Sequence, residues 1–158
     1  MPPSPTGTAD ARAIVVGLRR IVRALELYSQ DVRRDWNLTA PQLWALKTLR
    51  AGPCTLNQLA ELLLVHQSSA SLLVRRLERR GLLRRTRAKG DRRFVRIELT
   101  ERGAALAGET PEPAQGRLLH GLAAMPARRV KEIRRSLQVL VGAMEAGAVE
   151  ARFFFADA

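Results

Sequence analysis

A basic β-hairpin in the middle of the chain is the feature that most limits the possible folds. Two alternating runs of residues, 82–87 and 94–99, flank the segment AKGDRR. Alternation on both sides of a short loop that contains glycine predicts a β-hairpin. Because successive strand residues point to opposite faces, we expect Val95, Ile97 and Leu99 to face a core. The hairpin tip is also strongly basic, which a structural turn alone does not require.

Three short helices are predicted to precede the hairpin. The segments TAPQ (39–42) and TLNQ (55–58) both have the spacing of a capping box, in which a threonine and a glutamine satisfy backbone N–H groups at a helix start. A third helix is expected to end at Gly81, which suits the position after a helix. Three short helices followed by a basic hairpin predict a winged helix-turn-helix.

Longer amphipathic helices are predicted on both sides of this lobe. From Ile14 to Tyr28, apolar residues recur at helical spacing. From Val130 to Met144 they repeat at steps of three and four, which is the pattern of a seam against a partner helix. The fold class that we expect is therefore mainly α with a small β-hairpin wing: a winged helix-turn-helix plus N- and C-terminal dimerisation helices.

The charge of the chain is concentrated in one window. The net charge is +12, and residues 65–102 hold 12 Arg and Lys against 4 acids, a balance of +8 that leaves +4 for the remainder. A focused basic patch indicates a polyanionic partner, most often nucleic acid. An anionic membrane surface is the alternative, although such a surface favours an amphipathic helix over a hairpin.

Other classes of protein find little support in the sequence. There is no P-loop, nucleophile elbow or dinucleotide fingerprint, so we expect no enzyme and no cofactor. His66 and His120 are far apart and lack a further ligand at metal spacing. One cysteine, no signal peptide and no apolar run of roughly 18 residues predict a soluble, cytoplasmic protein.

The third helix is predicted to have two different faces. One side is apolar, and the opposite side has small and hydroxyl residues followed by arginines. Small residues let a backbone approach base edges, while hydroxyls and arginines contact bases and phosphates. The alternative is a solvated basic face on a core helix. The candidate DNA contacts on this helix are Gln67, Ser68, Ser69, Ser71, Leu72, Arg75 and Arg76.

The segments LTAPQLWALKTL, TLNQLAELLLVHQSSASLLVRRLERRGLLRR and GDRRFVRIELTERG resemble the MarR family of transcriptional regulators. The resemblance covers about residues 38–103 without an apparent insertion or deletion. It implies a homodimer whose N- and C-terminal helices interlock and whose subunits each present one winged lobe to double-stranded DNA. The implied function is sequence-specific regulation at a pseudo-palindromic operator, as a repressor released by a small ligand.

The sequence patterns, together with the resemblance, divide the chain into segments. We expect a disordered leader (1–10), dimerisation helices (11–36 and 101–150), a DNA-binding lobe (37–100) and a C-terminal tail (151–158).

In the family the wing enters the minor groove, and the second Arg of the D-R-R motif is inserted there and oriented by the Asp. These residues are Arg93 and Asp91 here, with Arg92 and Lys89 on the DNA backbone. A narrow minor groove concentrates negative potential, which suits a guanidinium group. The alternative is that Asp91 and Arg93 only hold the hairpin tip together.

Two residues depart from the family pattern. His66 stands where a Ser or Asp often caps the recognition helix, and histidine is a poorer cap. Leu72 stands where an Arg often contacts a base; it cannot donate a hydrogen bond but can pack on a thymine methyl. The operator sequence of relatives therefore does not transfer to this chain.

An effector pocket is predicted between the terminal helices and the winged lobe, where many family members bind a ligand. Tyr28, Trp36 and Trp44 would supply its walls, and Arg19 or Arg23 would bind an acidic group. This favours a small aromatic acid as the effector. The alternative is that the aromatic residues only pack and that the regulator is constitutive.

Three further alternatives remain open. Cys54 is interpreted as a packing residue, with a redox sensor as the alternative. The segment RFFF, residues 152–155, is interpreted as an anchor for dimer packing. The chain as a whole could instead be an architectural nucleic-acid-binding protein without sequence preference or effector, or a protein-interaction module that kept the winged fold.

Overall fold

The structure, a computed structural model, describes residues 5–88 and 91–149, with side chains given except at 5–8, 88 and 91–94. In chain order the elements are α1 (Pro5–Trp36), α2 (Ala40–Thr48), the 3-10 turn η1 (Leu49–Ala51), α3 (Leu56–Leu62), α4 (Gln67–Arg79), β1 (Leu83–Ala88), β2 (Asp91–Leu99), α5 (Glu101–Glu109), α6 (Ala114–Ala123), α7 (Ala127–Ala143) and the 3-10 turn η2 (Ala146–Ala148). The predicted fold class, mainly helical with a hairpin wing, is confirmed.

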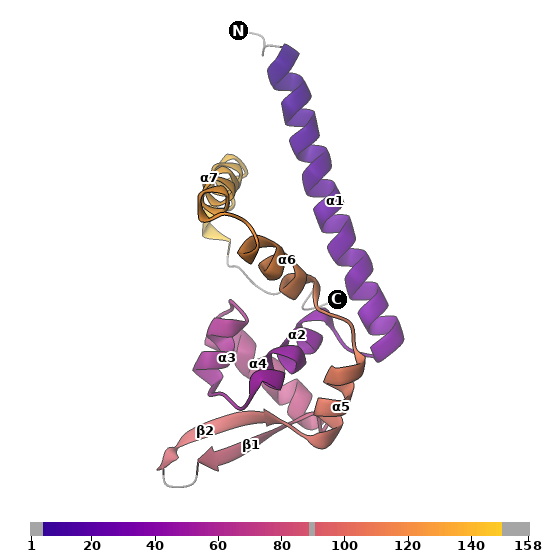
Figure 1. Cartoon of the computed structure of the whole chain (residues 1–158), viewed down its shortest axis with the longest axis vertical. Helices are drawn as coiled ribbons and strands as arrows, with labels where there is room; N and C mark the ends of the chain where they lie inside the picture. The colour runs from indigo at the N-terminus through magenta and orange to yellow at the C-terminus, as the bar shows by residue number, and fades with distance from the viewer. Residues whose placement is uncertain (1–4, 89–90, 150–158) are drawn as a thin grey trace.

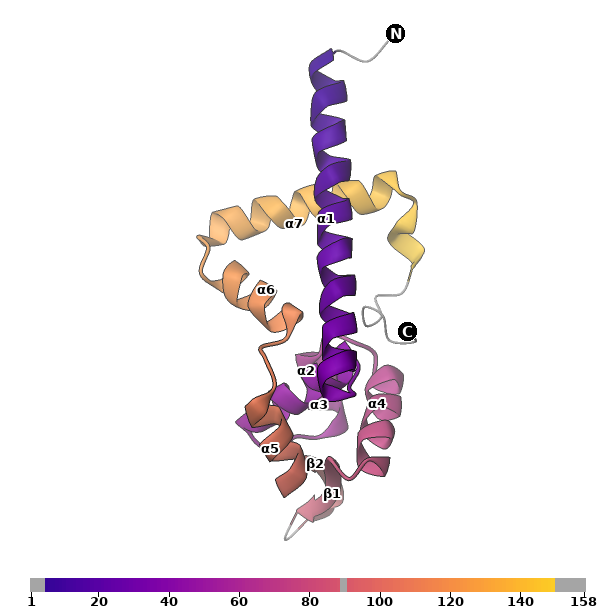
Figure 2. The same cartoon turned by 90° about the vertical axis from the view of Figure 1, so that its right-hand side faces the viewer.

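The elements form two parts, which we call the winged lobe (α2 to α5 with the hairpin) and the terminal helices (α1, α6 and α7). In Figure 1 α1 extends far beyond the winged lobe, and α7 lies beside its distal half. Figure 2, turned by a right angle, shows α7 lengthwise across α1, whereas Figure 1 shows it nearly end-on. The two helices therefore cross, at a distance from the hairpin.

Both predicted capping boxes are confirmed. The backbone N–H of Thr39 donates to Oε1 of Gln42 over 2.9 Å, and Thr55 and Gln58 repeat the arrangement at the same distance. At the other end of the helix-turn-helix, Gly81 has φ +68, a left-handed conformation that glycine adopts without a steric penalty. These local signals fix where the short helices begin and end.

The core of the winged lobe is mainly aliphatic, includes the buried Trp44, and comes from every one of the lobe's elements. Val32 near the end of α1 is also buried, and it joins the long helix to the lobe. The largest fully buried side chains in the lobe are Leu38, Leu43, Leu46, Leu59, Leu63, Val74, Leu77, Leu82 and Ile97.

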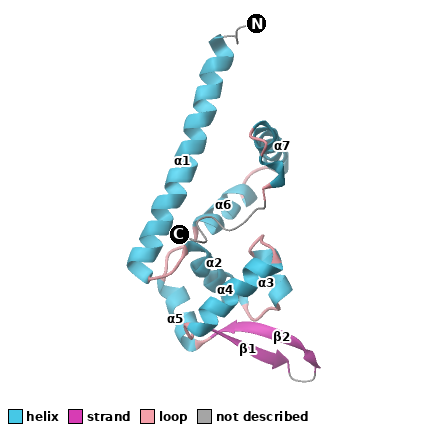
Figure 3. Ribbon diagram, turned by 180° about the vertical axis from the view of Figure 1, so that it is seen from behind, coloured by secondary structure: helices cyan, strands magenta, loops and turns pink. Residues whose placement is uncertain are grey.

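The hairpin is antiparallel, and a single bridging residue before α3 also pairs with β2 near the base of the hairpin. Leu83 pairs with Leu99, and Cys54 forms an isolated bridge with Ile97 through bonds of 3.1 and 2.8 Å. Ile97 is 2% exposed, as expected, and Leu99 is half-buried. The prediction that Val95 faces the core is wrong: its side chain is 41% exposed. The reason is visible in Figure 3, where the hairpin continues past the helices that cover its base.

The ends of the terminal helices differ from the sequence pattern in two places. The first helix starts at Pro5, inside the segment 1–10 that we expected as a leader, and proline suits a first helical position. From the sequence we expect a break at Pro111 and Pro113 and a helix that resumes at Arg117, but α6 starts at Ala114, because Pro113 occupies its N-cap position. The tail 151–158, with its RFFF segment, lies outside the described residues.

Candidate nucleic-acid interface

The two predicted faces of α4 are present in the structure. Ala70, Leu73, Val74 and Leu77 are buried against the lobe. The opposite face is open to solvent, and Leu72 on it is 41% exposed. Among the candidate DNA contacts, the exposed residues are Gln67, Ser68, Leu72, Arg75 and Arg76, and the half-buried ones are Ser69 and Ser71.

Some arginines of the basic window are engaged within the lobe. Arg84 Nε lies 2.7 Å from Glu98 Oε1, and Arg85 Nε lies 3.0 Å from Glu78 Oε1. Arg80 Nη1 donates to Gln42 Oε1 over 3.2 Å. These contacts link α4, the hairpin and α2, so the three arginines have a structural role in the lobe.

Other arginines leave their charge available to a partner. In the described part of the chain, Arg75, Arg76 and Arg79 of α4 are exposed and form no ion pair. Arg87 and Arg96 of the hairpin are likewise exposed. The unneutralised charge therefore lies on the solvent face of α4 and on the hairpin, which are neighbours in the lobe.

The wing tip is positioned in part. Asp91, Arg92 and Arg93 are the first residues of β2, at the far end of the hairpin in Figure 1, and their side chains are not among those described. Lys89 lies outside the described residues. The roles of these side chains in a minor groove remain predictions.

The start of α4 contains a contact that the sequence analysis missed. The N-cap residue is His66, whose side chain makes no capping hydrogen bond. The next residue, Gln67, donates from Nε2 to Oδ1 of Asn57 over 2.6 Å. The sequence signal for this contact is the polar residue Asn57 in the first turn of α3, because a helix-turn-helix brings that turn beside the start of the second helix.

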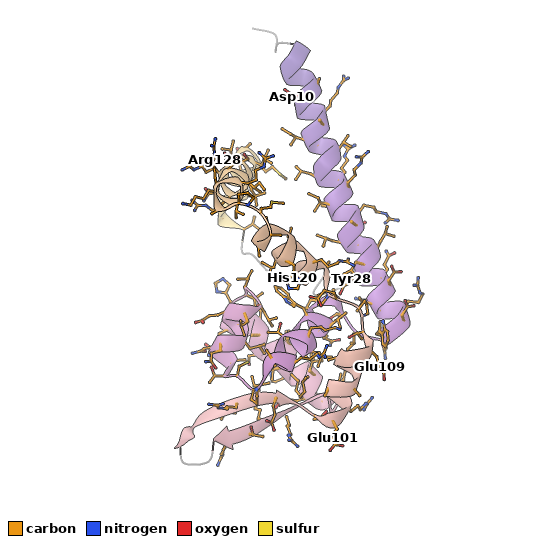
Figure 4. The ribbon with its side chains drawn as sticks, viewed as in Figure 1. Asp10, Tyr28, Glu101, Glu109, His120 and Arg128 are labelled. Atoms are coloured by element: carbon orange, nitrogen blue, oxygen red, sulfur yellow. The ribbon has the colours of Figure 1, made fainter. Side chains whose placement is uncertain are left out.

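The predicted pocket residues are divided between two hollows. Tyr28 and Trp36 line one of about 520 Å³, together with Arg117 of α6. Trp44 lines another of about 450 Å³ between α2 and α6. Figure 4 shows Tyr28 pointing from α1 toward α6 at this junction.

The two arginines that were predicted to bind an acidic group do not lie at these hollows. Arg19 and Arg23 line neither hollow, and Arg23 Nη1 lies 3.2 Å from Glu26 Oε2. Instead, the Arg117 guanidinium lies 5.5 Å from the centroid of the Tyr28 ring, a cation–π distance. Arg34 also lines the Tyr28 hollow. The sequence pattern missed Arg117, because its contact with α1 depends on where the proline break directs α6.

Burial changes the pKa of two side chains at this junction. It raises the pKa of Tyr28 to about 12, so the phenol stays neutral to a higher pH than an exposed tyrosine does. Burial and the neighbouring Arg50 lower the pKa of Lys47. The Lys47 ammonium donates to the carbonyl of Thr110, which fastens the segment between α5 and α6 to α2.

Cys54 has the surroundings of a packing residue. Its backbone bridges Ile97, and burial raises the pKa of its thiol, which disfavours the reactive thiolate. Within residues 5–88 and 91–149, no group of three or more His, Cys, Asp or Glu side chains is placed to hold a metal ion. Nor is any helix in these ranges both long and apolar enough to cross a membrane.

Comparison with known proteins identifies the family of the chain. A sequence profile of the MarR family matches residues 36–93, from the end of α1 to the first residues of β2. The organic hydroperoxide resistance transcriptional regulator of Bacillus subtilis (strain 168) is 32% identical over 106 residues, which cover 66% of this chain and 71% of that protein. The chain belongs to the MarR family.

Further comparisons agree with this MarR assignment. The HTH-type transcriptional regulator PecS of Dickeya dadantii (strain 3937) is 33% identical over 104 residues, which span 63% of this chain and 63% of PecS. The structure of Streptococcus pneumoniae FabT in complex with DNA is similar in fold, with a TM-score of 0.58 and 19% identity over 85% of this chain and 97% of that one. The profile match includes all of α2, α3, α4 and β1, so it covers most of the candidate interface.

Proposed function

We propose that this MarR family protein is a homodimeric regulator that binds a specific double-stranded DNA sequence and represses transcription until a small ligand releases it. The observation that carries the proposal is the solvent face of α4, where hydroxyl residues and unpaired arginines lie beside a basic wing. The relatives PecS and the Bacillus subtilis regulator are transcriptional regulators, and FabT was solved with DNA.

On this proposal α4 enters the major groove and the wing enters the adjacent minor groove. The serines of α4 allow close approach, and Leu72 packs on a thymine methyl. Arg75 and Arg76 bind phosphates, which fixes register without specifying sequence. Arg93 inserts into the minor groove, where the negative potential is concentrated.

The dimer is proposed from the apolar surface of the terminal helices. Ile133 and Leu137 of α7, with Ile21 of α1, are exposed in a single chain. A second copy that covers this surface would place two winged lobes related by a two-fold axis. The operator would then be a pseudo-palindrome with half-sites about one helical turn apart.

A selection of bound sites from random and genomic DNA at physiological salt tests the proposal. We expect an enriched pseudo-palindrome, and an affinity that falls steeply with salt because several phosphates are neutralised. Salt-dependent binding without an enriched sequence would favour the architectural alternative. Absence of DNA binding would favour a protein-interaction module.

The Arg93→Ala substitution tests the wing. We expect it to weaken operator binding by about 1–3 kcal/mol, and Asp91→Ala to cost less, because that change removes only the orientation of the arginine. Arg76→Ala is the control, since losing a phosphate contact should weaken all DNA sequences alike. These affinities are measured by fluorescence anisotropy on operator and scrambled duplexes. Unchanged operator binding by Arg93→Ala would refute the minor-groove assignment.

A small aromatic acid is the proposed effector. The hollow beside Tyr28 and Trp36 offers flat apolar walls, a phenol donor and the guanidinium group of Arg117 for a carboxylate, whereas the Arg34 guanidinium is already paired with Asp31 and Asp35. A ligand that prefers a dimer with incorrectly spaced lobes would release the operator. The test titrates salicylate while tryptophan fluorescence and operator release are followed. If millimolar salicylate changes neither tryptophan fluorescence nor operator binding, the alternative of a constitutive regulator is favoured.

A further inference from the structure

The bond between Gln67 and Asn57 joins the N-terminal ends of the two helices of the helix-turn-helix. Gln67 is the first residue of α4, and Asn57 lies in the first turn of α3. Their side chains are 2.6 Å apart, from Nε2 to Oδ1, and both residues are exposed. The pair therefore lies outside the packed core. Its main effect is to fix the direction of an amide on the solvent face.

That bond limits what Gln67 can offer to a base pair. A glutamine amide has two N–H donors and one acceptor oxygen, and Asn57 occupies one of the donors. One N–H and the oxygen Oε1 remain. Adenine presents an acceptor, N7, and a donor, the N6 amino group, to the major groove, so it matches both. Guanine presents two acceptors there and does not match Oε1.

We propose that Asn57 is a positioning residue that orients Gln67 to bind an adenine at one base pair of each half-site. This inference rests on the proposed function, because it requires α4 to lie in the major groove. An amide that is held before DNA arrives loses less conformational entropy on binding. The same restraint disfavours a rotated amide that would direct only its N–H groups at guanine, so it contributes specificity as well as affinity.

The experiment compares sites selected at physiological salt by the full-length protein and by Asn57→Ala, Gln67→Ala and the double variant. We expect the unsubstituted protein to enrich an adenine at one position of each half-site. Asn57→Ala should lower that preference by roughly five- to tenfold and leave the other positions unchanged, since a matched bidentate pair discriminates by at least this factor. Gln67→Ala should abolish the preference, and the double variant should equal Gln67→Ala because the residues act as one unit.

The conservative variant Asn57→Asp separates positioning from a general effect on binding. Its carboxylate still accepts from Gln67, so the adenine preference should persist, while repulsion from phosphates lowers affinity for every sequence. If the unsubstituted protein enriches a palindrome and Asn57→Ala enriches the same one, the positioning role of Asn57 is wrong, and the proposed function as a sequence-specific regulator is still supported. If the unsubstituted protein enriches no sequence, the proposed function falls and the adenine assignment falls with it. Thermal unfolding confirms that each variant is folded.

Discussion

Every residue of α2 from Ala40 to Leu46 is buried, whereas α7 contains no buried residue in its 17 positions. Helix α7 does have apolar side chains, but they are exposed: Leu137 is 54% exposed, and Met144 at the C-cap is 71% exposed. The difference is that α2 has neighbours from α1, α3, α4 and α5. For α7, the described chain supplies the short turn η2 that follows it and a hollow against α1, lined by Leu18 and Ile21.

This contrast shows that the winged lobe and the terminal helices depend on different sources of stability. The lobe has a closed, mainly aliphatic core, capping boxes on α2 and α3, and a hairpin held near its base by the bridge from Cys54. The terminal helices expose apolar side chains along both α1 and α7. Contiguous exposed apolar surface of this kind marks an interaction site in soluble proteins. A second copy of the chain is the partner that we propose, so the terminal helices should be the part that responds to changes in oligomeric state.

The largest effect is expected from Leu137→Asp in the middle of α7. If a second copy covers this residue, an unpaired carboxylate would be buried there, which costs several kcal/mol. We expect the dissociation constant of the dimer to rise at least about a hundredfold, as measured by analytical ultracentrifugation. Operator affinity should fall with it, because a monomer engages only one half-site.

Gln138→Asp is the matched control for this change. It introduces the same charge one position along α7, where the side chain is exposed and lies outside the apolar seam. The dimer should persist in this variant, and the lobe should unfold at the same temperature in both. A Leu137→Asp protein that remains dimeric would contradict the proposed dimer surface.

Sequence patterns predicted the winged lobe well because its boundaries depend on local chemistry. Capping boxes at Thr39 and Thr55 act over three residues, and a positive φ at Gly81 acts on one. Non-local features were harder to predict. Val95 lies on the same face of β2 as the buried Ile97, but the alternation of residues does not show how far along the hairpin the helices cover that face.

The candidate sites show the same limit. The exposed face of α4 followed from helical periodicity, since one helix determines it. The partner of Gln67 in α3 and the position of Arg117 beside Tyr28 depend on how separate helices pack. For that reason the predicted pocket residues are divided between two hollows, and the cation at Tyr28 comes from α6 where the prediction expected α1.

A smaller effect, confined to the winged lobe, is expected from Gly103→Ala. A Cβ atom at Gly103 would overlap the backbone carbonyl of Leu82, where α5 packs on the start of the hairpin. Because backbone cannot move aside as a side chain can, we expect a loss of about 1–3 kcal/mol in the free energy of unfolding, measured by urea denaturation.

The control for this substitution lies in the same helix. A Cβ at Gly108 would have no neighbour within 4 Å, so Gly108→Ala should stabilise α5 by up to about 1 kcal/mol through helix propensity. Dimerisation should be unaffected by Gly103→Ala at concentrations where the lobe stays folded. Equal stability of the two variants would mean that α5 does not pack tightly on the hairpin.

The smallest effect concerns the junction of the two parts and is seen at high pH. Burial raises the pKa of Tyr28 to about 12, above its ordinary value of 10.0. A raised folded-state pKa means that the stabilisation is complete below the unfolded pKa and is lost as the pH rises through the folded pKa. Stability should therefore decline between about pH 10 and pH 12, and the decline should be shallower in Tyr28→Phe.

Tyr28 is the only tyrosine in the chain, so tyrosinate absorbance reports its titration directly. The midpoint should lie near pH 12 in the native protein and near 10 in denaturant. A native midpoint near 10 would show that α6 does not cover this side chain in solution, and that α1 meets the lobe without the contact that lines the proposed effector hollow.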